Sequence, residues 1–134
     1  MAWIKLKPSA WDRQEVMEKA GSFWVNIRKN TRKVRVGGFF GGCRNGASYF
    51  ILDSNKVVPD NTWTHVAATY DGAILRIYIN GVLSGKSSVL VPGPVCVNTE
   101  PLAIGAKHRT IPPPEDAAFF NGGMDTVRIF DAAL

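Results

Sequence analysis

The 134-residue sequence lacks any long apolar run. No stretch approaches the roughly 18 apolar residues that a membrane-spanning helix needs, so no membrane span is expected. Its first residues, MAWIKLKPSAW, do not form a signal peptide, because the apolar stretch is short and Lys5 and Lys7 interrupt it. If the protein is exported, its export signal is therefore expected to lie outside this chain.

Cysteine is scarce, with only Cys43 and Cys96. Their spacing fits neither a metal-binding motif nor a Cys-x-x-Cys redox pair. They form either one disulfide, as in an exported protein, or two buried thiols. Because neither lies in a cysteine-rich framework, the sequence favours two free thiols.

Motifs for catalysis are also missing. There is no Gly-x-Ser-x-Gly elbow, and neither cysteine has a histidine placed beside it in the sequence. His65 falls in the middle of an expected strand, where a packed structural role is expected. The sequence therefore predicts a protein that is not an enzyme.

Acidic residues are few in the first part of the chain. Residues 1–44 hold ten Lys and Arg against three Asp and Glu (+7), and the remainder holds six against eight (−2). A basic half can bind nucleic acid, an anionic glycan or a lipid surface, or it can be a solvated strand face. Nucleic acid is not expected, because no helix-turn-helix, zinc-ligand spacing or RNP signature is present.

The hydrophobic pattern has a period of two almost throughout, which is typical of half-buried strands. Strands are expected at Trp3–Lys7, Gln14–Lys19, Phe23–Lys29, Lys33–Phe40, Ser48–Leu52, Trp63–Tyr70, Leu75–Ile79, Val82–Ser84, Leu102–Gly105 and Met124–Phe130. Asn80-Gly81, between two alternating runs, is the strongest turn signal, because a type I′ turn needs positive φ at both central residues. The pairs Gly37-Gly38 and Gly41-Gly42 indicate bulges or a bend. Together these features predict an all-β, antiparallel two-sheet sandwich or barrel with no helix.

Three segments carry a resemblance to a known family. Residues 61–85, NTWTHVAATYDGAILRIYINGVLSG, resemble the central signature of laminin G-like and pentraxin-like domains. Residues 119–134 resemble the closing strand of the same group, and residues 98–106 the strand before it. MAWIKLKPS is similar to the Ala-Trp-x-Lys-Pro strand that normally lies well inside such a domain. The chain thus resembles a concanavalin A-like (laminin G-like) domain spanning residues 1–134.

The resemblance implies a jelly-roll of two antiparallel sheets, together with one departure from the family. Relatives carry about 40 residues before the Ala-Trp strand, including a strand that lies beside the closing one. Without that region an open sheet edge is expected, and exposed edge amides invite a partner strand. Homodimerisation through an edge or an exposed sheet face is one expectation, and a monomer with a blunted edge is the other. The Glu-x-Asp-x-x-Glu strand of hydrolases with this sandwich is absent, and Glu15 and Glu18 do not replace it.

The family also suggests candidate sites. Relatives often bind Ca²⁺, which takes six to eight oxygen ligands, so Asp125 and Asn121 are candidate ligands, the alternative for Asp125 being a purely structural carboxylate. Glycan binding needs an exposed aromatic platform beside polar groups. Two loops carry candidate residues for such a site. The first loop has Trp11, Asp12 and Arg13, and the second has Lys107, His108 and Arg109. The basic hairpin of Arg28, Lys29, Arg32, Lys33 and Arg35 is a candidate polyanion site with strong salt dependence.

These observations predict a non-catalytic recognition module that binds extracellular carbohydrate, carried by a larger surface or secreted protein. The alternative is a structural or adhesion domain that binds protein and has no sugar site. An exposed Trp11 would favour the first and a buried Trp11 the second.

Overall fold

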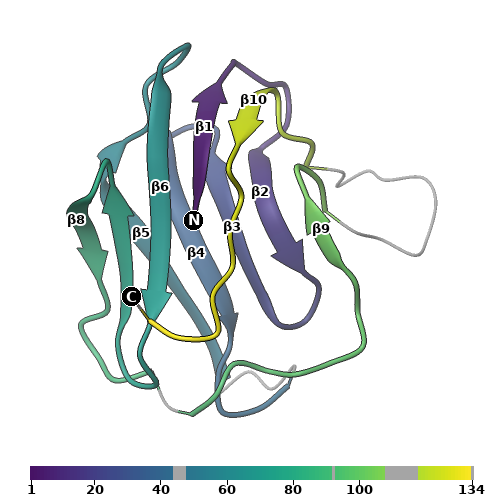
Figure 1. Ribbon diagram of the computed structural model, residues 1–134, viewed down its shortest axis with the longest axis vertical. Coiled ribbons are helices and arrows are strands. Elements are labelled where there is room, and N and C mark those ends of the chain that lie inside the picture. The colour runs from purple at the N-terminus through teal and green to yellow at the C-terminus, as the bar shows by residue number, and fades with distance from the viewer. Residues whose placement is uncertain (44–47, 92, 108–117, 134) are drawn as a thin grey trace.

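The computed structural model describes residues 1–43, 48–91, 93–107 and 118–133. Two antiparallel five-stranded sheets pack face to face (Figure 1), and no helical element occurs in these ranges. The predicted all-β sandwich is therefore confirmed. No helix among the described residues is long and apolar enough to cross a membrane.

The front sheet, here called sheet A, has the order β10-β1-β6-β7-β8. Its strands are β10 (Gly122–Asp125), β1 (Ala2–Leu6), β6 (Trp63–Tyr70), β7 (Leu75–Ile79) and β8 (Val82–Lys86). The hairpin between β7 and β8 turns at Asn80 and Gly81, whose φ values are 52° and 76°. The Asn-Gly signal in the sequence thus located a real left-handed turn.

The second sheet, sheet B, has the order β5-β4-β3-β2-β9. It contains β5 (Tyr49–Val57), β4 (Lys33–Phe39), β3 (Phe23–Arg28), β2 (Arg13–Lys19) and β9 (Leu102–Ile104). The outermost strands β5 and β9, like β10 and β8 in sheet A, have a strand neighbour on one side only among the described residues. Association through such an edge stays a prediction.

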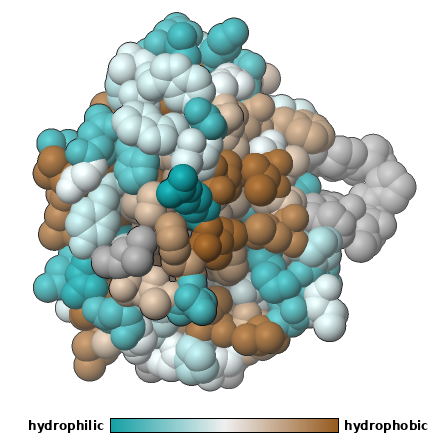
Figure 2. Space-filling view, in the orientation of Figure 1, coloured by the Kyte–Doolittle hydropathy of each residue, from teal (hydrophilic) through white to brown (hydrophobic). Residues whose placement is uncertain are grey.

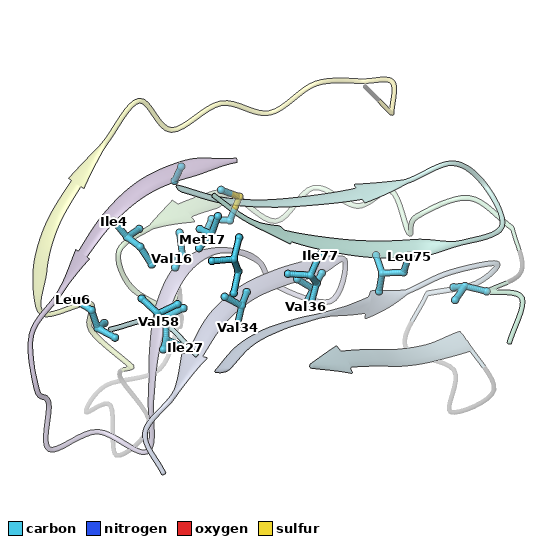
Figure 3. Close-up of a cluster of buried hydrophobic side chains, with 14 of the residues drawn as sticks. Ile4, Leu6, Val16, Met17, Ile27, Val34, Val36, Val58, Leu75 and Ile77 are labelled. Carbon is cyan, nitrogen blue, oxygen red and sulfur yellow. The ribbon is translucent and has the colours of Figure 1, made fainter. Parts of the chain in front are cut away.

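The core lies between the sheets, where alternate side chains of each strand meet (Figure 3). Ile4 and Leu6 of β1 pack opposite Val16, Ile27 and Val34 of sheet B, and all five are at most 1% exposed. In β1 and β7 the period-two pattern of the sequence matches the alternation of buried and more exposed side chains.

Two strands differ from the sequence-based prediction. β5 was expected to end at Leu52 but continues to Val57, because Lys33 and Arg35 of β4 pair with Val57 and Asp53. The closing strand was expected to run from Met124 to Phe130 but ends at Asp125. The next residue, Thr126, has a φ of 50°, which breaks the extended backbone.

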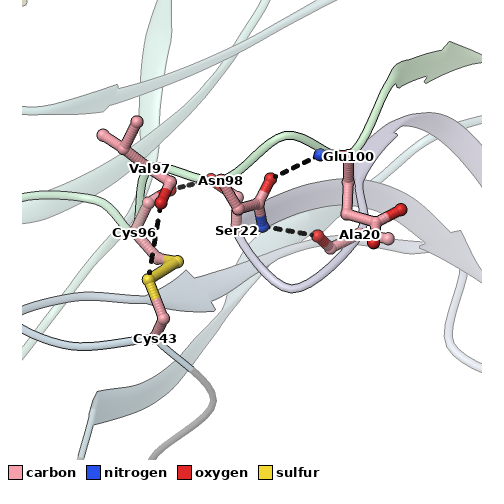
Figure 4. The surroundings of a disulfide bond; sticks show 7 residues. All are labelled: Ala20, Ser22, Cys43, Cys96, Val97, Asn98 and Glu100. Carbon is pink, nitrogen blue, oxygen red and sulfur yellow. Dashed lines mark hydrogen bonds between the residues drawn. A yellow bond between two sulfur atoms is a disulfide. The ribbon is translucent and has the colours of Figure 1, made fainter.

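The cysteines form a disulfide (Figure 4), so the expectation of two free thiols was wrong. The Cα atoms of Cys43 and Cys96 lie 5.0 Å apart. Backbone bonds bring the two segments together: the amide of Cys96 donates to the carbonyl oxygen of Phe39 at 2.8 Å. In addition, the Ser22 hydroxyl donates to the Cys96 carbonyl oxygen at 2.6 Å. The cysteines lie close together because segments far apart in the sequence pair through their backbones. The spacing of the two cysteines in the sequence does not indicate this pairing.

Candidate functional site

The outer face of sheet B collects aromatic and charged side chains from four strands. Val25 and Ile27 of β3 and Val34 and Val36 of β4 belong to the core, so the alternate positions of these strands point outward. The cross-strand register places the outward residues of β2, β3, β4 and β5 in adjacent rows. We call the following set the sheet B outer face: Glu15, Glu18, Trp24, Asn26, Arg28, Arg35, Gly37, Phe39, Tyr49 and Asp53.

Three aromatic rings form a cluster at one end of this face. The Trp24 ring lies 6.2 Å from Phe39 and 5.5 Å from Tyr49, and Phe39 and Tyr49 are 5.5 Å apart, all measured between ring centroids. Such tilted and edge-on arrangements are the favoured geometries for aromatic pairs. Tyr49 is 48% exposed, so the cluster presents ring surface to solvent.

Gly37 provides the space in which Trp24 lies. A Cβ atom at position 37 would be 2.6 Å from Cε2 of the indole, far closer than real Cβ contacts. The sequence predicted a bulge or bend at Gly37-Gly38, but the register shift of this strand pair lies between Lys33 and Arg35. A larger residue at position 37 would overlap the indole of Trp24, so the position requires glycine.

A buried polar group lies next to the aromatic cluster. Glu15 and Asn26 are both 2% exposed, and they are paired across β2 and β3. Glu15 Oε1 accepts hydrogen bonds from Arg13 Nε at 2.9 Å and from Asn26 Nδ2 at 3.3 Å. Glu15 Oε2 and Asn26 Oδ1 are buried and accept no hydrogen bond within the described residues. These two buried acceptors therefore have no donor among the described residues, which is uncommon for buried polar atoms.

The pKa of the Glu15 carboxyl is raised to about 7, mainly by burial and also by the nearby Glu18 carboxylate. The hydrogen bond and charge of Arg13 act in the opposite direction but do not cancel the effect of burial. Near neutral pH the group therefore exists in both protonation states.

This pKa predicts a pH dependence of stability. Between about pH 4.5 and about 7 the folded protein keeps a proton on Glu15 that the unfolded chain has released, so stability falls as pH rises through this window. Glu15→Gln should remove that fall and gain at most about 3 kcal/mol at pH 8. Urea denaturation of both proteins at pH 5 and pH 8 measures it. Equal pH slopes for the variant and the wild type would contradict the assignment.

Accessible charged groups continue the face beyond the aromatic cluster. Arg35 and Asp53 form a two-pronged ion pair, with Nε–Oδ1 and Nη2–Oδ2 distances of 2.6 and 2.7 Å. The hydrogen bond from Arg35 lowers the pKa of Asp53. Arg28 bonds to Asp12 at 3.0 Å. The Arg35–Asp53 pair lies in the row next to the rings, and it leaves further N–H groups and lone pairs there for other bonds.

The predicted polyanion site lies on the hairpin of β3 and β4. Arg28, Arg32 and Arg35 each pair with an aspartate, namely Asp12, Asp60 and Asp53. The ammonium of Lys29 donates to the Ala10 carbonyl oxygen at 3.1 Å. Much of the positive charge is therefore balanced locally, and polyanion binding stays a prediction.

The two predicted glycan loops are placed differently. Trp11 is 36% exposed and lies edge-on to Phe119, with ring centroids 6.0 Å apart. Asp12 and Arg13 are engaged by Arg28 and Glu15, so this group adjoins the sheet B outer face. Lys107 is half-buried and is the last residue of the described segment 93–107. His108 and Arg109 lie outside the described residues.

The two predicted calcium ligands, Asn121 and Asp125, lie at opposite ends of β10. Asn121 Nδ2 donates to the Pro8 carbonyl oxygen at 2.6 Å, and the Asn121 amide donates to Gln14 Oε1 at 2.7 Å. Asp125 follows at the far end of β10, roughly 13 Å along the strand, and accepts a bond from the Thr126 hydroxyl at 3.1 Å. The described residues contain no group of three acidic, histidine or cysteine side chains for a metal ion. Because Ca²⁺ also takes backbone and amide carbonyl oxygens as ligands, calcium binding stays a prediction.

A second aromatic surface lies on the outer face of sheet A. Trp3 and Trp63 are 42% and 45% exposed, and the His65 ring lies 5.3 Å from Trp3. Burial lowers the pKa of His65, which fits its expected structural role. Together with Asn80 and Gly81 these residues line a hollow of about 560 Å³. Asn80 Oδ1 accepts the His65 amide at 2.9 Å, so this acceptor of the hollow is already bonded within the sheet.

A family model for laminin G-like domains, described as the concanavalin A-like lectin/glucanases superfamily, matches residues 1–134. The chain belongs to this family. No curated protein matches it. Membership in the laminin G-like family indicates a recognition or binding module, and such domains are generally non-catalytic and typical of extracellular proteins.

The aromatic cluster of this laminin G-like domain was not found from the sequence. Trp24 and Tyr49 are far apart in the chain and meet only through the register of β3, β4 and β5. One signal was available: Trp24 and Asn26 alternate in the sequence with Phe23, Val25 and Ile27, which pack in the core. The pattern did not show that Gly37 and Tyr49, on the two neighbouring strands, would lie next to Trp24.

Proposed function

We propose that the domain is a non-catalytic module that binds carbohydrate on the sheet B outer face. The observation that carries this proposal is the partly exposed cluster of Trp24, Phe39 and Tyr49 beside the Arg35–Asp53 pair. A pyranose has an apolar C–H face that stacks on aromatic rings and a rim of hydroxyls that donates and accepts hydrogen bonds. Rings and charged groups stand side by side here in the arrangement that such a ligand needs.

An extracellular place of action is part of the proposal. The Cys43–Cys96 disulfide supports it, because disulfides persist in oxidising environments and are rare in the cytosol. The non-catalytic part of the proposal rests on Glu15. Its free oxygen is buried under its neighbours, whereas hydrolysis requires two carboxyl groups that flank an accessible glycosidic bond.

A glycan-array screen of the purified domain tests this function. We expect reproducible binding to a restricted set of sugars, with and without a calcium chelator, because the part of this face that the structure describes contains no group of three acidic, histidine or cysteine side chains for a metal ion. Loss of all hits in chelator would instead indicate a metal site that includes Asp125. A blank array from folded protein, in both conditions, would rule out the sugar site.

The alternative function is structural or adhesive, through protein contacts alone. The exposed apolar side chains of the edge strand β5 favour it: Ile51 is 46% exposed and Val57 is 53% exposed. Trp11, at 36%, is exposed, which by the criterion given above favours carbohydrate binding over this alternative. A blank array combined with protein partners that protect β5 from hydrogen exchange would establish this alternative.

A further inference from the structure

A row of polar side chains crosses sheet B beside the aromatic cluster. It consists of cross-strand partners on β2, β3, β4 and β5, namely Glu15, Asn26, Arg35 and Asp53. Trp24 lies in the next row, because its partner on β4 is Gly37, two residues beyond Arg35. Two residues of a strand span roughly 7 Å, so a sugar stacked on the rings would reach the Arg35–Asp53 end of the polar row.

The arginine of this row is already bound by a carboxylate. Arg35 Nε and Nη2 donate to the two carboxylate oxygens of Asp53 at 2.6 and 2.7 Å. This hydrogen bond is the main cause that raises the pKa of Arg35 and lowers the pKa of Asp53, so both groups stay charged. Arginine binds a ligand carboxylate or sulfate through the same kind of two-pronged contact. The charge of Arg35 is therefore balanced within the protein.

Negative charge also lies in the row of the indole itself. Glu18 of β2 is the cross-strand partner of Trp24 and is 8% exposed. Its carboxylate contributes to the raised pKa of Glu15, which shows that its charge acts on this part of the face. An anionic group on the rings would thus have Glu18 in one row and Asp53 in the next, and like charges repel each other at short range.

The other basic residues of this face lie further from the rings. Lys33 is four residues before Gly37 on β4, which corresponds to roughly 13 Å along the strand. Arg28 is four residues beyond Trp24 on β3, and it bonds to Asp12 at 3.0 Å. As seen from the rings, both lie beyond the polar row. The basic composition of residues 1–44 therefore does not give the rings a positive surrounding.

We propose that the sheet B outer face selects uncharged sugars and discriminates against sugars that carry a carboxylate or a sulfate. This inference rests on the proposed carbohydrate site and names the class of its ligand. The C–H face of the sugar would stack on Trp24 and Tyr49, while two neighbouring hydroxyls contact the Arg35–Asp53 pair. Because a hydroxyl both donates and accepts, it bonds to the remaining N–H groups and lone pairs without breaking the ion pair.

The Arg35–Asp53 pair is the reason for the discrimination. A ligand carboxylate would have to replace Asp53 at the guanidinium or share the guanidinium with it. Replacement leaves the Asp53 charge without its partner, and sharing places two carboxylates side by side. Hydroxyls cause neither of these losses, so the same pair that binds a neutral sugar disfavours an acidic one.

Titration of the ¹⁵N-labelled domain with two pairs of methyl glycosides tests the proposal. The uncharged probes are methyl β-glucopyranoside and methyl β-galactopyranoside, and their uronates carry a carboxylate in place of the C6 alcohol. At least one uncharged probe should shift the Trp24 indole N–H, and its uronate should bind at least tenfold more weakly. The opposite face, over sheet A, has apolar surface around its middle (Figure 2), and its exposed Trp3 and Trp63 report unspecific adsorption.

Asp53→Asn frees Arg35, so we expect it to raise the affinity for the uronate at least tenfold. Asp12→Asn is the matched control, because it removes the same charge but frees Arg28, which lies further from the rings. This control should leave the affinity for the uronate unchanged. Both aspartates are partly exposed, and exposed ion pairs contribute little to stability, so both variants should fold.

Two results would overturn the inference while the sugar site stands, because a sugar would still shift the Trp24 indole. One is a uronate that binds the wild type as tightly as its uncharged counterpart, or more tightly. The other is an affinity for the uronate that Asp53→Asn raises no more than Asp12→Asn does. If none of the four probes shifts the Trp24 indole, the proposed carbohydrate site fails, and the inference fails with it.

Discussion

Replacing Cys43 and Cys96 together by serine is expected to destabilise the domain by about 4 kcal/mol, since the disulfide closes a loop with a sequence separation of 53 residues. For a chain of this length that loss corresponds to a fall in melting temperature of roughly 10–15 °C. The physical reason is that the cross-link removes conformations of the unfolded chain, which the reduced chain regains. Calorimetry of the wild type and the double variant measures the difference.

Reduction of the wild type should reproduce the result, and reduction of the double variant should change nothing further. The fold itself should survive, because Ser22 and Phe39 still hold the 96 segment through their bonds to the backbone of residue 96. Equal melting temperatures for the reduced and oxidised wild type would show that the two cysteines are not bonded in solution.

Gly37→Ala is expected to weaken glycan binding about tenfold, which corresponds to about 1.4 kcal/mol. The added methyl group would overlap the indole of Trp24 and push it off the sheet, so the aromatic cluster would lose its shape without losing any polar group. Isothermal titration with a sugar from the array measures the affinity, and near-UV circular dichroism reports the moved indole.

Gly42→Ala is the matched control, because the nearest atom to its added Cβ would be Ser48 Oγ at an ordinary 3.7 Å. This variant should bind sugar like the wild type. Unchanged affinity in Gly37→Ala, with a changed indole signal, would show that sugar does not stack on Trp24.

Local signals in the sequence located most of the fold. Phe23, Val25 and Ile27 alternate along the expected strand Phe23–Lys29 and do pack in the core, and Asn80-Gly81 identified the turn where φ is positive. These features depend on neighbours in the chain, which the sequence displays directly. The end of β10 was not predicted because Thr126 adopts a left-handed conformation, which threonine rarely does.

The candidate site was much harder to predict, because it depends on register across three strands. Trp24 lies over Gly37, and Tyr49 lies beside both, only because β3 pairs with β4 and β4 with β5 in this alignment. The disulfide was missed for the same reason. Residues far apart in sequence are brought together by strand pairing, and a period-two pattern does not record which strands pair.

The central claim is that sugar binds on the sheet B outer face, and the indole signals of the four tryptophans test it most directly. A ¹⁵N-labelled sample titrated with an array-positive sugar should show a large shift of the Trp24 indole N–H and of the Asn26 side-chain amide. The indoles of Trp3 and Trp63, on the opposite sheet, should stay in place. Shifts confined to Trp11, or to Trp3 and Trp63, would contradict the account and move the site to the loops or to sheet A.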